Sequence, residues 1–355
     1  MNITGLIEQI QPLDQAAMRA ARGRQNQLTK PAGSLGRLEE LSIQLAGIQR
    51  KPLPAIKDKA VIVMAGDHGV TAEGVSAYPQ EVTPQMVLNF LAGGAAINAL
   101  ARHAGARVVV VDMGMTNEID TSRFKRDLLI RRRVGAGTMN LAQGPAMRRE
   151  QAEESIQSGI EVALTEISNG ADILGTGDMG IGNTTPSAAI ACALMKLPPE
   201  KIAGRGTGVD DDGLQRKISA IARGLAVNQP NADDGLDVLA KVGGFEIGGL
   251  AGVMIGAASK RAPVMVDGFI STAAAMIAVT LAPQCREYLI AAHRSKENGH
   301  ALMLEWLGIK PLLDFDLRLG EGTGAALGIS MAEAACKVLS EMATFSEAGV
   351  SQVVE

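Results

Sequence analysis

Glu321 is the side chain in this sequence whose surroundings best suit proton transfer. It lies within Arg318-Leu-Gly-Glu-Gly-Thr-Gly324, immediately before an Ala-rich helical stretch. Its small neighbours leave room for a substrate against the carboxylate, and an apolar wall would raise its pKa toward that of a useful general base. A glutamate at a helix N-terminus is also stabilised by the helix dipole alone. The spacing therefore leaves two interpretations open, a catalytic base and a structural carboxylate.

A formal G-x-G-x-x-G motif occurs at Gly175-Thr-Gly-Asp-Met-Gly180. In a dinucleotide-binding unit the following strand supplies an acid that binds the ribose, but the next predicted strand, residues 201–203, does not end in one. We therefore expect a tight strand-to-helix turn whose backbone N–H groups face a ligand. Asn183-Thr-Thr-Pro186 then begins the helix, and its hydroxyl and amide groups suit a phosphate or carboxylate. Helix capping alone would account for one of these residues but not for all of them.

A second glycine cluster, Gly204-Arg-Gly-Thr-Gly208, follows the strand predicted at residues 201–203. Its alternating glycines, with Gly206 at the centre, can present backbone N–H groups to an anion, and Lys217 on the next helix can neutralise the charge. The alternative is a flexible loop with no ligand. The motif G-x-x-x-x-G-K-[ST] does not occur in the sequence, which argues against P-loop nucleotide hydrolysis.

Neither the histidines nor the cysteines have the spacing of a metal site. No two histidines are four residues apart and the cysteines are scattered: His68, His103, His293, His300, Cys192, Cys285 and Cys336. His68, within Gly66-Asp-His-Gly69, is either a ligand or base, or a hydrogen-bonded histidine at a strand end. The sequence also lacks G-x-S-x-G, the motif of a nucleophilic serine. We therefore expect no metal and no serine nucleophile.

The cysteines also indicate a compartment. An odd number of cysteines without paired spacing is typical of a reducing cytosol. The first 24 residues contain acids and glutamines where a signal peptide needs an apolar run. The uncharged stretches 179–195 and 268–285 contain Ser, Thr, Pro and Gly and are near or below the length of a membrane span, so buried helices are expected there. The chain is predicted to be cytoplasmic, without membrane contact.

The composition indicates a globular enzyme. The 355-residue chain is 46% hydrophobic, which excludes an extended disordered chain. It contains 41 glycines but only 6 Phe, 2 Tyr and 1 Trp, so a flat substrate would have few rings to stack on. The formal net charge is −4 and there is no basic tract, so no nucleic-acid partner is expected.

A repeated pattern must position these clusters: a short apolar run ends in a Gly/Asp cluster, and an Ala-rich helical stretch follows. It occurs at residues 60–65, 108–111, 172–174 and 263–266. Continuous apolar runs predict strands buried on both faces of a parallel sheet, and ligands of such sheets bind beyond the carboxyl ends of the strands. Helices are expected at residues 35–48 and 324–340.

The predicted fold class is α/β, with a doubly wound, mainly parallel sheet flanked by helices. No Pro- or Ser-rich linker divides the chain, so we expect a single unit over residues 1–355. Within it we expect a nucleotide-binding core at about 55–300, and a small helical subdomain packed beside it and formed by about 1–50 and 305–355.

Taken together and in this order, the clusters resemble the family of nicotinate-nucleotide–dimethylbenzimidazole phosphoribosyltransferases. The resemblance extends from about residue 28 to residue 336. The matching segments are Lys30-Pro-Ala-Gly-Ser-Leu-Gly-Arg-Leu-Glu39, Ala65-Gly-Asp-His-Gly-Val70, Gly180-Ile-Gly-Asn-Thr-Thr-Pro186, Asn228-Gln-Pro-Asn231, Lys241-Val-Gly-Gly-Phe245, Pro263-Val-Met-Val-Asp-Gly-Phe269 and Leu319-Gly-Glu-Gly-Thr-Gly-Ala325.

The resemblance implies a reaction. Nicotinate mononucleotide gives its phosphoribosyl group to 5,6-dimethylbenzimidazole, with inversion at C1′, and the products are α-ribazole 5′-phosphate and nicotinate, in assembly of the cobalamin nucleotide loop. The leaving nicotinate is a pyridinium whose nitrogen becomes neutral on departure, so no acid need protonate it. The attacking benzimidazole must lose the proton on its other nitrogen, and one proton acceptor suffices for that. The resemblance thus implies small-molecule substrates, no cofactor, no metal and a homodimer.

The resemblance also assigns roles to individual residues. Glu321 is the proton acceptor, and the positions lining the same pocket are Arg318, Leu319 and Gly320. The positions around the ribose and phosphate are Gly180, Gly206, Lys217 and Ser295. Asp178 stands where members commonly carry Glu, and its shorter carboxylate reaches less far toward the ribose or an oxocarbenium. Residues 78–86, near the slot for the base, vary in the family, so the choice of base stays open.

Three other functions are compatible with the sequence. A paralogue with the same fold would activate adenine or a phenol instead of a benzimidazole. A non-catalytic module would bind the nucleotide without turnover, although Glu321 in its glycine frame argues against this. An NAD oxidoreductase would bind a dinucleotide at residues 175–180.

Overall fold

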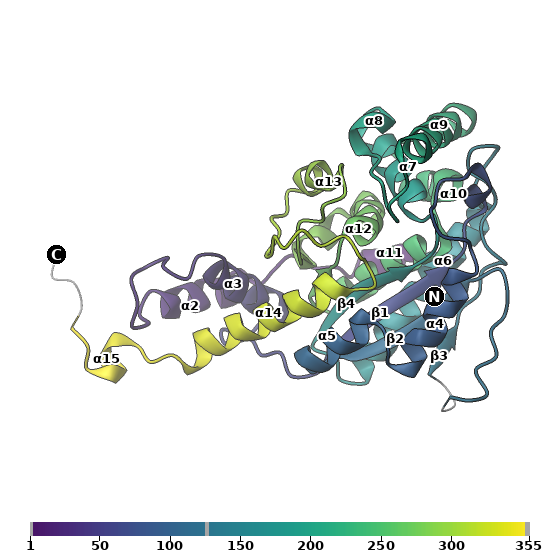
Figure 1. Cartoon of the computed structure of the whole chain (residues 1–355). Coiled ribbons are helices and arrows are strands. Elements are labelled where there is room, and N and C mark those ends of the chain that lie inside the picture. Colours follow the sequence, from purple (N-terminus) through teal and green to yellow (C-terminus); the bar gives the residue numbers. More distant parts are fainter. Residues whose placement is uncertain (1–2, 125–127, 352–355) are drawn as a thin grey trace.

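The computed structural model describes residues 3–124 and 128–351. Its centre is a sheet of six parallel strands in the order β3-β2-β1-β4-β5-β6, of which Figure 1 labels β3, β2, β1 and β4. The strands are β1 (Lys59–Gly66), β2 (Arg107–Gly114), β3 (Leu129–Arg131), β4 (Ile173–Met179), β5 (Val264–Val266) and β6 (Leu289–Ala291). This order is that of a doubly wound sheet, and the predicted α/β class is confirmed.

The apolar runs predicted as strands are strands in the structure. The run at 60–65 lies within β1 and that at 108–111 within β2, while those at 172–174 and 263–266 overlap β4 and β5. The strand expected at residues 201–203 is wrong, because helix α8 (Pro199–Ile202) occupies this stretch. The ring of Pro199 fixes φ near the helical value and so begins a helical turn.

The G-x-G-x-x-G segment is mostly strand, and the turn expected across it is wrong. Gly175 to Met179 belong to β4, and the turn to α7 (Thr184–Met195) begins only at Gly180. A side chain at Gly177 would place a Cβ 2.4 Å from the backbone oxygen of Glu321. Glycine is needed for this close packing, a long-range contact that the local sequence pattern does not reveal.

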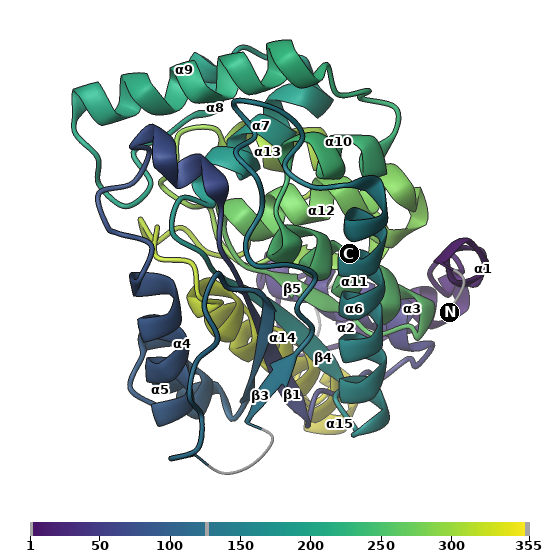
Figure 2. The same cartoon turned by 90° about the vertical axis from the view of Figure 1, so that its right-hand side faces the viewer.

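Helices cover both faces of the sheet. On one face lie α11 (Phe245–Ser259) and α12 (Phe269–Leu281), with α6 (Arg149–Ser168) packed outside α11. On the other lie α4 (Val82–Ala92), α5 (Ala96–Ala104) and the first half of α14 (Thr323–Glu341) (Figure 2). Alternate residues of β1 divide between these layers: Ile62 and Met64 join the core around α11, while Val61 and Val63 join the core around α14. Burial on both faces explains the continuous apolar run.

The remaining helices form two groups and several single turns (Figure 1). On the outer side of α12 lie α7, α8, α9 (Asp211–Asn228), α10 (Gly235–Val242) and α13 (His300–Leu307). Near the far end of α14 lie α2 (Gln15–Gln25), α3 (Arg37–Gln49) and α15 (Phe345–Ala348). The others are α1 (Ile3–Ile7), η1 (Gly69–Glu73) and η2 (Pro283–Tyr288).

Helices α3 and α14 confirm the helices predicted at residues 35–48 and 324–340. The single helix α14 contacts both the sheet and the α2–α3 pair. The division into a core at about 55–300 and a helical subdomain at about 1–50 and 305–355 stays a prediction.

The two uncharged stretches at 179–195 and 268–285 are mainly α7 and α12, whose side chains are largely buried. Within the described ranges, no helix combines the length and the apolar character that crossing a bilayer requires.

The sheet reverses its direction of growth between β1 and β4. After β1 the chain adds β2 and β3 on one side, and after β4 it adds β5 and β6 on the other. In open α/β sheets, ligands bind in the crevice at the carboxyl ends of the strands that flank such a reversal. The carboxyl ends of β1 and β4, at Gly66 and Met179, therefore mark the place to look for a site.

Candidate active site

Charged side chains from three strand ends gather at this reversal. His68 follows β1, Asp178 is the penultimate residue of β4, and Asp267 directly follows β5. All three side chains are buried. Asp178 is near enough to act electrostatically on both of the others. The crevice is therefore lined by ionisable groups held in a low-dielectric environment.

Glu321 lies in a left-handed turn that begins α14. Gly320, Glu321 and Gly322 have φ values of 81°, 61° and 91°. For the glutamate this conformation costs about 1–2 kcal/mol, which the surrounding packing offsets. Its side chain is 6% exposed, and Oε2 accepts a 3.4 Å hydrogen bond from the Ile97 amide at the start of α5. Burial raises the pKa of Glu321, against the effect of the Ile97 amide, and so favours proton uptake.

Asp178 lies beside the Glu321 turn. A Cβ added at Gly320 would be 3.2 Å from Oδ1 of Asp178, and Oδ2 accepts a 2.8 Å hydrogen bond from Nδ2 of Asn183. Burial raises the pKa of Asp178 to about 7 against the effect of the Asn183 hydrogen bond, and the Glu246 and Glu321 carboxylates add to the rise. Two carboxyl groups that titrate above their usual ranges are thus neighbours in the crevice.

His68 forms a buried ion pair with Glu246 from the first turn of α11. Nε2 lies 2.8 Å from Oε1, and the two side chains are 1% and 0% exposed. Burial alone would lower the pKa of His68, but the Glu246 carboxylate, together with those of Asp67 and Asp178, raises it above the usual value. A Cβ added at Gly180 would be 3.2 Å from Nε2, so the pair packs against the turn after β4. Of the two interpretations of His68, the structure supports the hydrogen-bonded histidine at a strand end.

Lys217 and the second glycine cluster form a basic group. Nζ donates to Oγ1 of Thr184 at 2.9 Å and to the carbonyl oxygen of Gly204 at 3.1 Å. A Cβ at Gly206, where φ is 52°, would be 2.8 Å from Nζ. Burial lowers the pKa of Lys217 to about 8, against the effect of Glu297. A desolvated ammonium beside exposed backbone is suited to bind an anion. The cluster follows helix α8 rather than the strand expected before it.

A hollow of about 500 Å³ adjoins the basic group, and Arg318 faces it from the segment before Glu321. Its walls are formed by Ala203, Gly204, Arg205, Leu214, Lys296, Glu297, Asn298, Asp316 and Arg318. Buried Ser295 adjoins these walls, since its Oγ accepts a 3.3 Å hydrogen bond from the Glu297 amide. Burial raises the pKa of Glu297, while Lys217, the Gly206 amide and Arg318 oppose the shift. Glu297 therefore lies amid the predicted basic residues.

The structure brings the predicted site residues together in two groups. The acidic group consists of Asp178, Gly180, Gly320 and Glu321, and the basic group of Gly206, Lys217, Ser295 and Arg318. Leu319 joins neither buried group, because its side chain is 57% exposed. It adjoins Gly320 in the chain and so lies at the rim of the acidic group.

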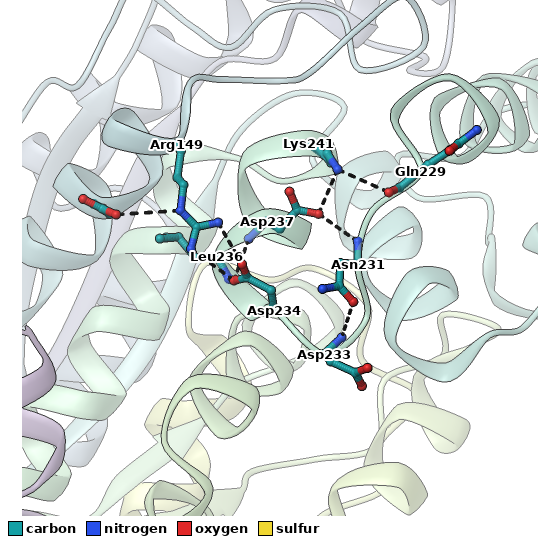
Figure 3. A network of polar contacts seen from close by, with 9 residues as sticks. Arg149, Gln229, Asn231, Asp233, Asp234, Leu236, Asp237 and Lys241 are labelled. Atoms are coloured by element: carbon teal, nitrogen blue, oxygen red, sulfur yellow. Dashed lines mark hydrogen bonds and ion pairs between the residues drawn. The ribbon is translucent and has the colours of Figure 1, made fainter.

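Two segments that carry the family resemblance build the scaffold of Figure 3 instead of the site. Nζ of Lys241 lies 2.9 Å from Oδ2 of Asp237 and donates to the carbonyl oxygen of Gln229 at 3.2 Å. Arg149 of α6 pairs with Asp234 at 2.8 Å at the start of α10. These contacts fix α10 between α6 and α9, and α10 leads through two glycines into α11.

Three buried acids at the site were not identified from the sequence: Asp267, Glu246 and Glu297. Asp267 carried a signal, since it directly follows an apolar strand. Glu246 and Glu297 carried none, because His68 is 178 residues away from Glu246 and Lys217 is likewise remote from Glu297. In the part of the chain that the structure describes, no three His, Cys, Asp or Glu side chains gather as ligands of one metal ion would.

An acidic group and a basic group suited to an anion, at the switch point of a doubly wound sheet, suit an enzyme that acts on a phosphorylated sugar. The family profile described as "Phosphoribosyltransferase" matches residues 10–350. The fold, the site and this match define the class: the chain is a member of a phosphoribosyltransferase family.

Individual relatives narrow the class. Proteins from Roseiflexus sp. and Chloroflexus aggregans are 59% and 58% identical over 349 and 353 residues, covering 98% and 99% of both chains. Both are named nicotinate-nucleotide–dimethylbenzimidazole phosphoribosyltransferase. The crystal structure of the Thermus thermophilus enzyme of that name has a TM-score of 0.90 and 49% identity, covering 96% of this chain and 100% of that one. The chain belongs to the nicotinate-nucleotide–dimethylbenzimidazole phosphoribosyltransferase family.

Proposed function

We propose that this chain transfers the phosphoribosyl group of nicotinate mononucleotide to 5,6-dimethylbenzimidazole, giving α-ribazole 5′-phosphate and nicotinate. The observation that carries the proposal is the placement of Glu321. A buried carboxylate with a raised pKa stands in the crevice between β1 and β4, and the Asn183–Thr184 pair connects its neighbour Asp178 to the anion-binding Lys217. One substrate can therefore present its phosphate to Lys217 while its reacting carbon faces the carboxylates.

Glu321 is the general base of the proposed reaction. One benzimidazole nitrogen attacks C1′ of the ribose, and the C1′–N bond to the pyridinium ring breaks with its electron pair going to the nicotinate nitrogen. The other benzimidazole nitrogen then carries a proton that must leave, and the Glu321 carboxylate accepts it. Attack from the face opposite the leaving group inverts C1′ and gives the α product. Burial of Glu321 raises its pKa toward the range in which such a transfer is efficient.

The other residues bind and orient the nucleotide. Lys217 and the open backbone at Gly206 hold the phosphate, and Ser295 and Arg318 lie beside the same group. Asp178, next to Gly320, faces the ribose and stabilises positive charge that develops at C1′ when its carboxylate is ionised. Exposed Leu319 supplies an apolar edge for the flat base.

The experiment that tests this function is incubation of the chain with nicotinate mononucleotide and an equimolar mixture of dimethylbenzimidazole, adenine and a phenol. Chromatography resolves the ribotides. The proposal expects α-ribazole 5′-phosphate as the main product, with an equal amount of nicotinate. A dominant adenine or phenol product would identify a paralogue with another base. The absence of any α-ribotide would identify a non-catalytic nucleotide-binding module.

We also propose that the enzyme is a homodimer that works in the cytoplasm. The three cysteines are free and buried, which suits a reducing compartment. The dimer is supported by the family resemblance alone. Light scattering behind a sizing column tests it, and a monomeric mass at assay concentration would overturn it.

A further inference from the structure

Asp267 is a buried carboxylic acid that connects two neighbouring strands, β5 and β4, to the Glu321 turn. It is 1% exposed and directly follows β5. Its own amide donates to Oγ1 of Thr176 in β4 at 3.2 Å. The backbone of Asp267 is therefore fixed by the neighbouring strand, and its side chain reaches across toward α14.

The Asp267 carboxylate binds the first turn of α14 with both oxygens. Oδ2 accepts a hydrogen bond from the Gly322 amide at 3.1 Å, and Oδ1 accepts one from the Ala325 amide at 3.0 Å. Gly322, the residue that precedes the helix, has no side chain and so cannot accept a hydrogen bond from the amide of Ala325, the third residue of α14. The capping function is supplied instead by a residue 55 positions away in the chain.

The turn that Asp267 holds in this way contains Glu321, the proposed general base. Glu321 adopts a left-handed φ of 61° between Gly320 and Gly322, a conformation that persists only where the surroundings enforce it. Close packing of Gly177 against the Glu321 carbonyl oxygen supports the turn from β4. The bond to the Gly322 amide supports it from β5, one residue beyond Glu321.

We propose that Asp267 is a positioning residue, whose carboxylate holds the Glu321 turn in the geometry that proton transfer requires. It has no role as a base itself, because both of its oxygens are directed at backbone amides. The inference rests on the proposed function of Glu321.

The experiment compares kcat and KM for nicotinate mononucleotide in the wild type, Asp267→Asn, Glu321→Gln and the double variant. Asparagine replaces one carboxylate oxygen by an NH2 group, which cannot accept a hydrogen bond. At least one of the two bonds from the Gly322 and Ala325 amides is therefore lost, whether Asp267 is ionised or protonated in the wild type. A misplacement of about 1 Å at a reacting group lowers the rate by up to about 10²-fold, so we expect a fall of that order in kcat and little change in KM.

The double variant separates positioning from general damage to the structure. If Asp267 acts through Glu321, Asp267→Asn adds no further loss of kcat once Glu321 has become Gln. If each change lowers kcat by its own factor and the factors multiply, the inference is wrong. It is also wrong if Asp267→Asn alone leaves kcat within about threefold of wild type. Hydrogen exchange at the Gly322 and Ala325 amides reports the capping bonds of Asp267 without any turnover. A wild-type chain that does not turn over would therefore refute the proposed function, while the capping bonds could still be tested.

Asp112 offers a matched control. It lies within β2 near its carboxyl end, is 2% exposed, and its Oδ1 accepts hydrogen bonds from the amides of Gly114 and Met115 at 3.0 and 2.9 Å. Asp112→Ala removes both bonds at this strand end, as Asp267→Ala removes both bonds to the turn before α14. We expect both alanine variants to lower the thermal midpoint, but only Asp267→Ala to lower kcat by more than about threefold. An equal loss of kcat in both variants would show that any such lesion slows the enzyme and would overturn the inference.

Discussion

Asn183 and Thr184 are neighbours at the start of α7, and their side chains contact groups of opposite charge. Nδ2 of Asn183 donates to Oδ2 of Asp178 at 2.8 Å, and Oγ1 of Thr184 accepts from Nζ of Lys217 at 2.9 Å. One peptide unit therefore connects the acidic group to the basic group. The spacing between Asp178 and Lys217 is fixed by the helix start. This suits a substrate with a phosphate at one end of a ribose and a reacting carbon at the other.

Lys217→Ala tests the basic group. The change removes the ammonium but leaves α9 intact, so binding of the mononucleotide phosphate should weaken while the chemistry at C1′ is spared. Hydrogen bonds to charged groups contribute about 1.5–3 kcal/mol, so KM for the mononucleotide should rise about 10- to 100-fold, with a smaller change in kcat. Lys201→Ala, on the exposed end of α8, is the control. An unchanged KM in Lys217→Ala would remove Lys217 from the phosphate site.

The pH dependence of kcat tests the acidic group. Burial raises the pKa of Glu321 above its usual 4.5 and that of Asp178 to about 7. Both groups act as carboxylates, so kcat should fall as the pH decreases toward and below 7. Asp178→Asn removes one negative charge beside Glu321, so Glu321 ionises more readily. The decrease of kcat on the acidic side of the pH profile, its acid limb, should therefore move to lower pH. Steady-state rates from about pH 4.5 to 9 measure it. A limb that does not move, or a wild-type limb below pH 4.5, would contradict this assignment.

The His68–Glu246 pair should stabilise the protein in a pH-dependent way. Burial alone would lower the pKa of His68, but the carboxylates of Glu246, Asp67 and Asp178 together raise it above 6.5. The folded protein therefore binds this proton more tightly than the unfolded chain. The stabilisation is complete below about pH 6.5 and is lost as the pH rises through the folded pKa.

Urea unfolding of the wild type and of the double variant His68→Gln/Glu246→Gln measures this contribution. Replacing both partners leaves no unpaired charge in the core. The difference in unfolding free energy should shrink with rising pH, by about 1.4 kcal/mol for each unit by which the pKa of His68 is raised. A difference that stays constant or grows with pH would show that His68 is neutral in the folded protein.

The sequence was sufficient to predict the long buried elements. The runs behind β1 and β2 are continuous and apolar, and the Ala-rich stretch after Glu321 has the periodicity of a helix. Strands β3 and β6 are three-residue strands that lie outside the repeated pattern of an apolar run followed by a Gly/Asp cluster, and they were not predicted. Gly175 and Gly177 were expected in a turn because glycine usually marks one, whereas here the backbone of Glu321 packs against the strand.

Candidate site residues could be proposed from the sequence where they stand in local patterns, but not where side chains meet across the fold. Glu321, Gly206 and Lys217 stand in local glycine-rich patterns that signal a ligand. Asp267 and Glu246 act through partners that lie far away in the chain, so their importance arises only from the sheet order that brings β1, β4 and β5 together. Buried acids whose partners are remote in the chain are thus harder to predict than residues that stand in a local motif.

The rate of ribotide formation by Glu321→Gln tests the central claim most directly. Glutamine keeps the size of the side chain and can still contact the Ile97 amide, but it cannot accept the benzimidazole proton. Loss of a general base predicts a fall in kcat on the order of 10²–10⁴, with the thermal midpoint and mononucleotide binding unchanged. Glu341→Gln, at the other end of α14, should behave as wild type. Turnover by Glu321→Gln within a few-fold of wild type would contradict the assignment of Glu321 as the proton acceptor.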